Sequence, residues 1–175
     1  QHPQWVQKVR EEAIANYKED TPPTDESLAQ LKAANAIAQE AMRMKPTTPQ
    51  LFMQAKEALV INDLQIEKDQ VLMLQNMKAQ NSDEYFTSAT EFRPERWLAE
   101  ACPYHQTHTP QNMRAFGHGP RFCPGMKLAT NEMISAISAV CKKYDLEMMV
   151  APNDVQEEFA FTMHPVNLLV NFKEG

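Results

Sequence analysis

Glycine is scarce in this sequence, since only four of the 175 residues are glycine. Glycine lets a backbone adopt positive φ or approach another group closely, so the few positions that carry it mark unusual backbone geometry. Three of the four glycines, Gly117, Gly119 and Gly125, fall in one short stretch. We therefore look for a functional site there first.

Basic residues and long apolar runs are also lacking. The 17 Lys and Arg against 23 Asp and Glu give a net charge of -6, the wrong sign for a surface that collects phosphate backbones. No segment approaches the roughly 18 apolar residues of a spanning helix, and residues 1–20 lack a signal-peptide layout. We expect a soluble chain that binds no nucleic acid, cytoplasmic if its source is bacterial.

The three cysteines are an odd number, which argues against a disulfide framework and favours thiol chemistry. Hydrophobic residues at 43% and charged residues at 23% are ordinary for a globular domain, so wholesale disorder is excluded. The length fits one domain or a piece of a larger one. The chain begins with Gln1 and enters a helical pattern at once, which suggests the tail of something longer.

Hydrophobic residues recur at helical spacing in three segments, and the stripe is strongest in the last. Thr24, followed by Asp25 and Glu26, is a good N-terminal signal for the second segment. The predicted helices span residues 2–17, 25–45 and 126–144.

Short apolar runs predict strands within residues 50–75 and 146–172. At the end of the chain, residues 159–163 and 168–172 resemble the two strands of a hairpin. Residues 76–125 show neither period and are punctuated by prolines, which predicts a long ordered meander ending in a loop. The predicted fold class is α+β, mainly α.

The loop before the third predicted helix has the sequence FGHGPRFCPG. Cys123 lies just before the helix start, where free amides and the helix dipole favour a thiolate, which is a metal ligand. Gly119 and Gly125 let backbone pass close to a flat group, Arg121 supplies a cation for an anionic edge, and Phe116 supplies an apolar cover. A thiolate-ligated haem needs these features.

These residues fit the pattern Phe-x-x-Gly-x-Arg-x-Cys-x-Gly, and the chain thereby resembles the cytochrome P450 family. The resemblance implies the C-terminal part of that fold, with a small β-sheet, the haem loop before a long helix, and a terminal β-hairpin. It implies haem b (iron protoporphyrin IX) bound by Phe116, Gly119, Arg121, Cys123 and Gly125, with Cys123 as the axial ligand of the iron. A buried cysteine beside a tight turn is the simpler alternative.

Two weaker motifs agree with this resemblance in their order along the chain. Glu40-Ala41-Met42-Arg43 resembles the family's Glu-x-x-Arg, and FRPERW resembles its Pro-x-Arg-Phe element with Trp97 in place of Phe. Alone, Glu40 and Arg43 would be typical of an exposed pair one helical turn apart. The resemblance implies instead that Glu40, Arg43 and Arg96 form a buried charge triad beneath the haem.

By position, the resemblance also implies a set of substrate contacts after the second helix and in the terminal hairpin. These are Thr47, Thr48, Gln50, Leu51, Phe161 and Thr162. The meander departs from the common pattern, since Gln80-Asn81-Ser82 stands where many members have His-Arg-Asp.

Two further family elements are missing from the sequence: the acid-alcohol pair of a long central helix and an early Trp-x-x-x-Arg. Residue 1 is therefore an internal residue of a full-length enzyme, or the chain is a remnant. The implied function is a haem-thiolate monooxygenase whose haem-ligand half this chain supplies, and the isolated fragment is expected to be inactive. The implied partners are O2, a small organic or lipid-like substrate, an electron-donor protein (a reductase or ferredoxin) and the missing N-terminal part, through which membrane attachment would occur.

Two alternatives stay open. The chain could be a catalytically inactive haem-binding remnant or a regulatory module with the same ligand. It could also be a small zinc-binding interaction domain, because Cys102, His105 and His108 have spacings that suit zinc. His118 in the loop could be a ligand in principle, but the cysteine occupies the motif position.

Overall fold

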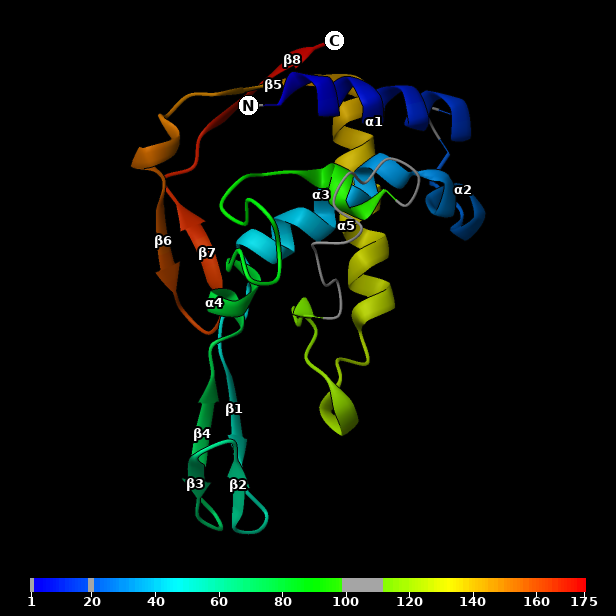
Figure 1. Ribbon diagram of the computed structural model, residues 1–175. Coiled ribbons are helices and arrows are strands. Elements are labelled where there is room, and N and C mark those ends of the chain that lie inside the picture. Colours follow the sequence, from blue (N-terminus) through cyan, green and yellow to red (C-terminus); the bar gives the residue numbers. More distant parts are fainter. Residues whose placement is uncertain (1, 19–20, 99–111) are drawn as a thin grey trace.

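A computed structural model describes residues 2–18, 21–98 and 112–175. Three long helices cross in the upper part of the molecule, and a slender β arm projects away from them (Figure 1). The long helices are α1 (Pro3–Asn16), α3 (Lys32–Met44) and α5 (Met126–Lys143), and the short ones are α2 (Asp25–Gln30) and α4 (Asn76–Gln80). None of the described helices is both long and apolar enough to cross a membrane.

The hydrophobic core lies where the three long helices meet. Val9 and Ala13 of α1, Leu31 at the start of α3, and Ile134 and Cys141 of α5 form one buried cluster. Side chains one or two turns apart on each helix supply these contacts, so the helical periodicity of the sequence translates directly into the core. α3 packs against both α1 and α5, which also pack against each other.

The helix predicted over residues 25–45 is in fact two helices. Thr24 caps α2 as expected, with its side chain accepting a hydrogen bond from the N–H of Ser27. The break falls at Leu31, whose ψ of 64° is not helical. The first amides of α3 therefore need partners, and Glu12 of α1 accepts from the N–H of Ala33 at 2.8 Å. The other two predicted helices are each correct to within one or two residues.

The predicted strands within residues 50–75 form the projecting arm. It consists of β1 (Leu51–Gln54), β2 (Leu59–Ile61), β3 (Leu64–Ile66) and β4 (Val71–Leu74). β1 pairs antiparallel with β4, and β2 pairs with β3 across a two-residue loop in which Asn62 has a φ of 50°. The side chains on this two-stranded ribbon are mostly exposed.

The C-terminal strands pair differently from the predicted hairpin of residues 159–163 and 168–172. The observed hairpin joins β6 (Gln156–Phe159) to β7 (Met163–Val166), with its turn at Phe161, whose φ is 93°. The last strand, β8 (Val170–Glu174), pairs instead with β5 (Tyr144–Met148), which begins at the end of α5. The prediction was wrong because the partner of β8 lies far away in the sequence.

Residues 76–125 contain short turns of helix within the predicted meander. Besides α4 these are the 3-10 turns η1 (Pro94–Trp97) and η3 (Gly119–Arg121). η1 packs against α3, and η3 lies in the glycine-rich loop that leads into α5. The meander therefore brings the FRPERW motif next to α3 and the glycine-rich loop next to α5.

Candidate functional site

The carboxylate of Glu40 is the centre of a buried polar network. Arg43 donates from Nε to Oε2 and from Nη2 to Oε1, each at 2.9 Å. Three more donors come from one meander segment: the N–H of Arg93 to Oε1 at 2.9 Å, Nε of Arg96 to Oε1 at 3.2 Å and Nε1 of Trp97 to Oε2 at 2.9 Å. The side chains of Glu40, Arg43 and Arg96 have no exposed surface.

The two arginines of this network also hold the backbone of the meander. Nη1 of Arg43 donates to the carbonyl of Gln80 at 2.7 Å and Nη2 to that of Glu91 at 3.3 Å. Nη2 of Arg96 donates to the carbonyl of Ser88 at 2.8 Å. Each guanidinium has five N–H donors in a rigid fork, so one arginine fixes several chain segments at once.

The negative charge of Glu40 is stabilised by its hydrogen-bond partners. Burial by itself raises the pKa of this carboxyl, but the hydrogen bonds, led by that from Arg43, outweigh the burial and hold the pKa below its ordinary value of 4.5. Glu40 is therefore ionised at neutral pH.

The glycine-rich loop folds back on itself before α5. The N–H of Cys123 donates to the carbonyl of Phe116 at 3.0 Å, which closes the loop around η3. Gly117 and Gly119 have φ values of 75° and 66°, in the left-handed region that favours glycine. Arg121 is exposed at the tip, Phe116 and Cys123 are half-buried, and Gly125 is the N-cap of α5.

Two glycines leave open space along this loop, and one of them lies next to the thiol. A Cβ placed on Gly119 would meet no atom within 4 Å, and one placed on Gly125 would lie 3.8 Å from Sγ of Cys123. A side chain at either position would therefore fill space next to the thiol or at the loop tip. The donor chemistry and the space together fit a thiolate-ligated haem.

Cys123 is the better ligand of the two cysteines in the described ranges. Cys141 is also free, but it lies in the helical core with 5% of its surface exposed. Burial raises the pKa of the Cys141 thiol, with Arg10 acting in the opposite direction, so this side chain stays a neutral core residue. Cys123 is only half-buried and does not belong to that core cluster.

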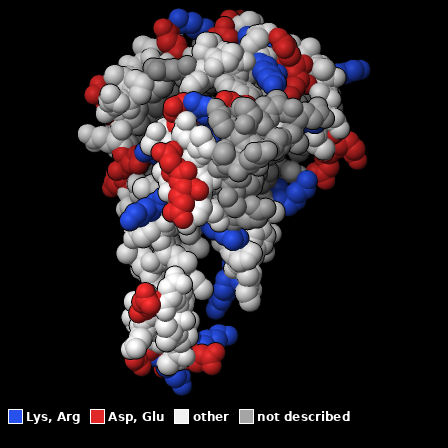
Figure 2. All heavy atoms as spheres, viewed as in Figure 1, with Lys and Arg blue, Asp and Glu red and all other residues white. Residues whose placement is uncertain are grey.

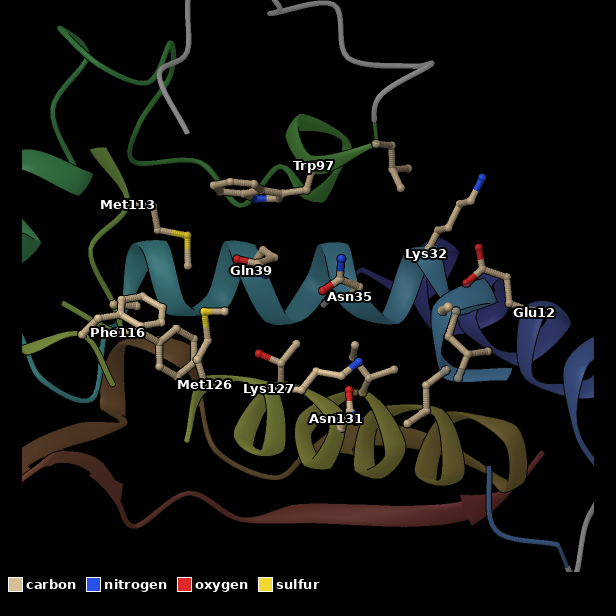
Figure 3. Close-up of a pocket in the computed structure, with 18 of the residues that line it drawn as sticks. Glu12, Lys32, Asn35, Gln39, Trp97, Met113, Phe116, Met126, Lys127 and Asn131 are labelled. Carbon is tan, nitrogen blue, oxygen red and sulfur yellow. The ribbon is translucent and has the colours of Figure 1, made fainter. Parts of the chain in front are cut away.

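A pocket of about 800 Å³ borders the loop on its α3 side. Figure 3 shows Gln39 and Asn35 of α3 opposite Lys127 and Asn131 of α5, with Trp97 above α3. Further lining residues include Phe116, Phe122 and Met126 at the loop end. Cys123 is not among the lining residues. The pocket therefore lies behind the loop and does not surround the thiol.

The residues predicted to contact substrate come from two segments that lie side by side. The carbonyl of Thr47 accepts a hydrogen bond from the N–H of Met163 at 2.8 Å. Phe161 is 93% exposed in the β6–β7 turn, next to Thr162. Gln50 is exposed and its amide approaches that of Gln75, whereas Thr48 and Leu51 are half-buried.

The zinc alternative gains no support. Cys102, His105 and His108 lie outside the described residues, and within residues 2–18, 21–98 and 112–175 no group of three His, Cys, Asp or Glu side chains is placed to hold a metal ion. His118 is exposed, and its Nδ1 lies 2.8 Å from Nη1 of Arg114.

Sequence reasoning missed two members of the site. Trp97 was noted only as a replacement for Phe, yet its indole N–H binds Glu40. Gln80 was noted only as a departure from a family pattern, yet it is fully buried and bonded to both α3 and the segment before the loop. The available signal was residue type: Trp97 in place of Phe, and Gln80 in a segment that departs from the family pattern, bring different hydrogen-bonding groups.

Comparison with known proteins decides the family. A sequence profile described as Cytochrome P450 matches residues 1–172. The chain belongs to the cytochrome P450 family. As a family, cytochromes P450 are haem-thiolate monooxygenases, which agrees with the haem cofactor that the resemblance implied.

Individual P450 proteins are similar over most of the chain. Cytochrome P450 12b1, mitochondrial, of Drosophila acanthoptera is 28% identical over 161 residues, which cover 88% of this chain and 30% of that protein. Protopine 6-monooxygenase of Eschscholzia californica is 31% identical over 148 residues, 85% of this chain and 28% of that protein. The chain thus spans less than a third of these relatives.

The fold agrees with solved P450 structures. The heme domain of cytochrome P450DA superposes with a TM-score of 0.86 at 24% identity, covering 99% of this chain and 38% of that domain. The predicted fold, part of a P450 domain with helices and small sheets, is confirmed.

Replacing Arg96 with Ala should cost about 3 to 5 kcal/mol in the free energy of unfolding, because it leaves the buried Glu40 carboxylate short of a partner. Arg93→Ala is the matched control from the same segment. Its side chain pairs with Glu91 at the surface, and it should cost about 1 kcal/mol or less. Urea denaturation of both variants measures the difference, and equal losses would show that Arg96 acts as an ordinary surface charge.

The lowered pKa of Glu40 makes part of the stability depend on pH. Its contribution is fully present above the ordinary value of 4.5 and is lost as the pH falls toward the lower pKa of the folded state. Stability should therefore drop below pH 4.5 in the wild type. Glu40→Gln should be less stable at neutral pH, with a shallower acid slope. Urea midpoints at several pH values on both sides of 4.5 test this, and parallel slopes for the two proteins would contradict it.

Proposed function

We propose that this chain supplies the thiolate side of a haem-thiolate monooxygenase, with Cys123 as the axial ligand of haem b, that is, iron protoporphyrin IX. The observation that carries the proposal is the loop itself. The free, half-buried Cys123 lies just before α5, and its backbone N–H donates to the Phe116 carbonyl. A Cβ on Gly125 would lie 3.8 Å from its Sγ, and one on Gly119 would meet no atom within 4 Å. Bound haem would supply the activation of O2, from which one oxygen atom is inserted into an organic substrate.

The chain's own residues each have a task toward the cofactor. Cys123 lies two residues before Gly125, the N-cap of α5, so its thiol is carried at the start of that helix. Arg121, exposed at the loop tip, would pair with the anionic edge of the haem, and the half-buried Phe116 would cover an apolar part of it. Gly119 and Gly125 keep the contact surface flat.

The buried network serves the site by fixing what lies behind the loop. Glu40 and Arg43 belong to α3, whereas Arg96 and Trp97 belong to the meander, so the network joins the two elements. A ligand loop carried on a fixed meander keeps its thiolate in one place. The network is thus a structural support and contacts no substrate.

Thr47, Thr48, Gln50, Leu51, Phe161 and Thr162 form the proposed substrate wall. The support for this is the contact between the segment after α3 and the β6–β7 turn, which turns two distant segments into one surface. The exposed Phe161 ring suits a small organic or lipid-like substrate. O2 and an electron-donor protein, a reductase or a ferredoxin, complete the set of proposed partners.

The proposed partner for the β arm is the N-terminal part of the same fold. The arm carries a row of exposed apolar side chains, among them Phe52 at 70%, Val60 at 64% and Val71 at 65% exposure. Figure 2 shows the projecting arm as mostly uncharged surface with charges gathered toward its end. An apolar surface of this kind normally packs against another part of a protein. Since the chain covers 38% of a solved P450 heme domain, the remaining part of such a domain is the occupant that fits.

The ligand assignment is tested by the ferrous carbonyl spectrum of the protein. The wild type should give the strongly red-shifted Soret band of thiolate ligation, and Cys123→Ala should lose it because the iron has no thiolate. Cys141→Ala is the control, since that thiol lies in the helical core. A red-shifted band that survives Cys123→Ala would disprove the proposal.

Residues 1–175 alone, given haem, substrate and a reductase, should consume electrons without forming product. This chain offers one face of the haem, and the sequence has no acid-alcohol pair to deliver protons on the other. Water would then reach the iron, and reduced oxygen should leave as superoxide or peroxide. The measurement is product formed per electron consumed, with peroxide release followed in parallel; coupled turnover by the isolated chain would contradict the expectation.

A further inference from the structure

Gln80, the last residue of α4, is fully buried and uses its whole side-chain amide. Its Nε2 donates to the carbonyl of Arg43 at 3.0 Å and to that of Met42 at 3.4 Å. Its Oε1 accepts from the backbone N–H of Arg114 at 2.8 Å. A buried polar side chain with every group satisfied has one preferred position, because any shift breaks a bond that water cannot replace.

On one side Gln80 caps α3. That helix ends at Met44, so the backbone carbonyls of its last turn accept no hydrogen bond from within the helix. Gln80 satisfies two of them, and Nδ2 of the next residue, Asn81, binds the carbonyl of Met44 at 3.1 Å. The carbonyl of Gln80 also receives Nη1 of Arg43, so the residue is joined to α3 through both backbone and side chain.

On the other side, through Oε1, Gln80 is connected to Cys123 by backbone hydrogen bonds. Arg114, whose N–H it holds, accepts at its own carbonyl from the N–H of Gly117 at 2.9 Å, which forms the turn around Phe116. The carbonyl of Phe116 then accepts from the N–H of Cys123 at 3.0 Å. A short series of hydrogen bonds and backbone links therefore connects the end of α3 to the proposed ligand.

We propose that Gln80 is a positioning residue that sets the place of the haem loop, and with it Cys123, relative to α3. The inference rests on the proposed function only where it concerns the iron. The hydrogen bonds of Gln80 reach neither the thiol nor the substrate wall, and we infer that it acts through the backbone of Arg114. It links the Glu40 network, which holds the meander, to the loop that holds the thiolate.

The chemistry of the amide explains why glutamine suits this position. The site asks for a donor toward two carbonyls and an acceptor for one N–H, and an amide offers both at fixed separation. Methionine has a similar length but neither group. Histidine offers one donor and one acceptor in its neutral form and can replace the amide in part.

The test compares amide hydrogen exchange and ferrous carbonyl spectra in the 175-residue chain carrying Gln80→Met, Gln80→His or Gln75→Met. Gln80→Met should speed exchange in residues 112–123 about tenfold, as expected for losing one buried hydrogen bond, with a smaller change in residues 131–141 of α5. It should also lower the fraction of the red-shifted thiolate form. Gln80→His should restore most of both signals. Gln75 is exposed, so Gln75→Met should change neither.

A general loss of stability is the competing explanation, and Leu31→Ala controls for it because Leu31 is buried in the core, away from the loop. If Gln80→Met accelerates exchange in both segments as Leu31→Ala does, or leaves residues 112–123 unchanged, the positioning role is overturned. Exchange is measured without haem as well as with it. Bound haem without the red-shifted thiolate band in the wild type would therefore refute the proposed function, while the exchange result still decides the role of Gln80.

Discussion

A carboxylate removed from water has to find several donors, and in this protein the carboxylate of Glu40 imposes that requirement on the rest of the structure. Desolvating one such ion costs several kcal/mol unless charges and hydrogen bonds surround it. α3 supplies one partner, Arg43, and the remaining donors come from the meander segment of Arg93, Arg96 and Trp97. The meander can therefore take only positions that bring these donors to α3.

The position of the glycine-rich loop, the proposed haem loop, depends on the same network. Since Arg43 also holds the carbonyl of Gln80, and Gln80 holds Arg114, the network that satisfies Glu40 extends to the entry of the loop. The other end of the loop is fixed by α5, which packs against α1 and α3. The thiol of Cys123 thus lies between a polar anchor and a helical one, and its place follows from both.

The sequence was informative where motifs or periodicity are local. The order of the Glu-x-x-Arg and FRPERW elements pointed to Glu40, Arg43 and Arg96 together, and the structure joins these three in one buried network. The glycine-rich loop pointed to Cys123, whose role as haem ligand stays a proposal. The sequence was uninformative where contacting residues lie far apart along the chain. The break at Leu31 needs Glu12 of another helix to satisfy α3, and the pairing of β8 with β5 joins segments separated by the β6–β7 hairpin. Neither contact leaves a pattern in neighbouring residues, and the same holds for the amide of Gln80.

The helical core buries little apolar surface, and this explains why the polar contacts of the Glu40 network matter for the stability of the site. The buried face of α3 is built largely from alanines, including Ala33, Ala34, Ala36 and Ala38. Small side chains let α1 and α5 approach closely, but each removes little apolar surface from water, and burial contributes roughly in proportion to area. Larger apolar side chains lie exposed on the β arm, where they contribute nothing until another surface covers them. The helical core therefore positions the site while the Glu40 network supplies much of its rigidity, so that loss of this network should loosen the ligand loop before it unfolds the helices.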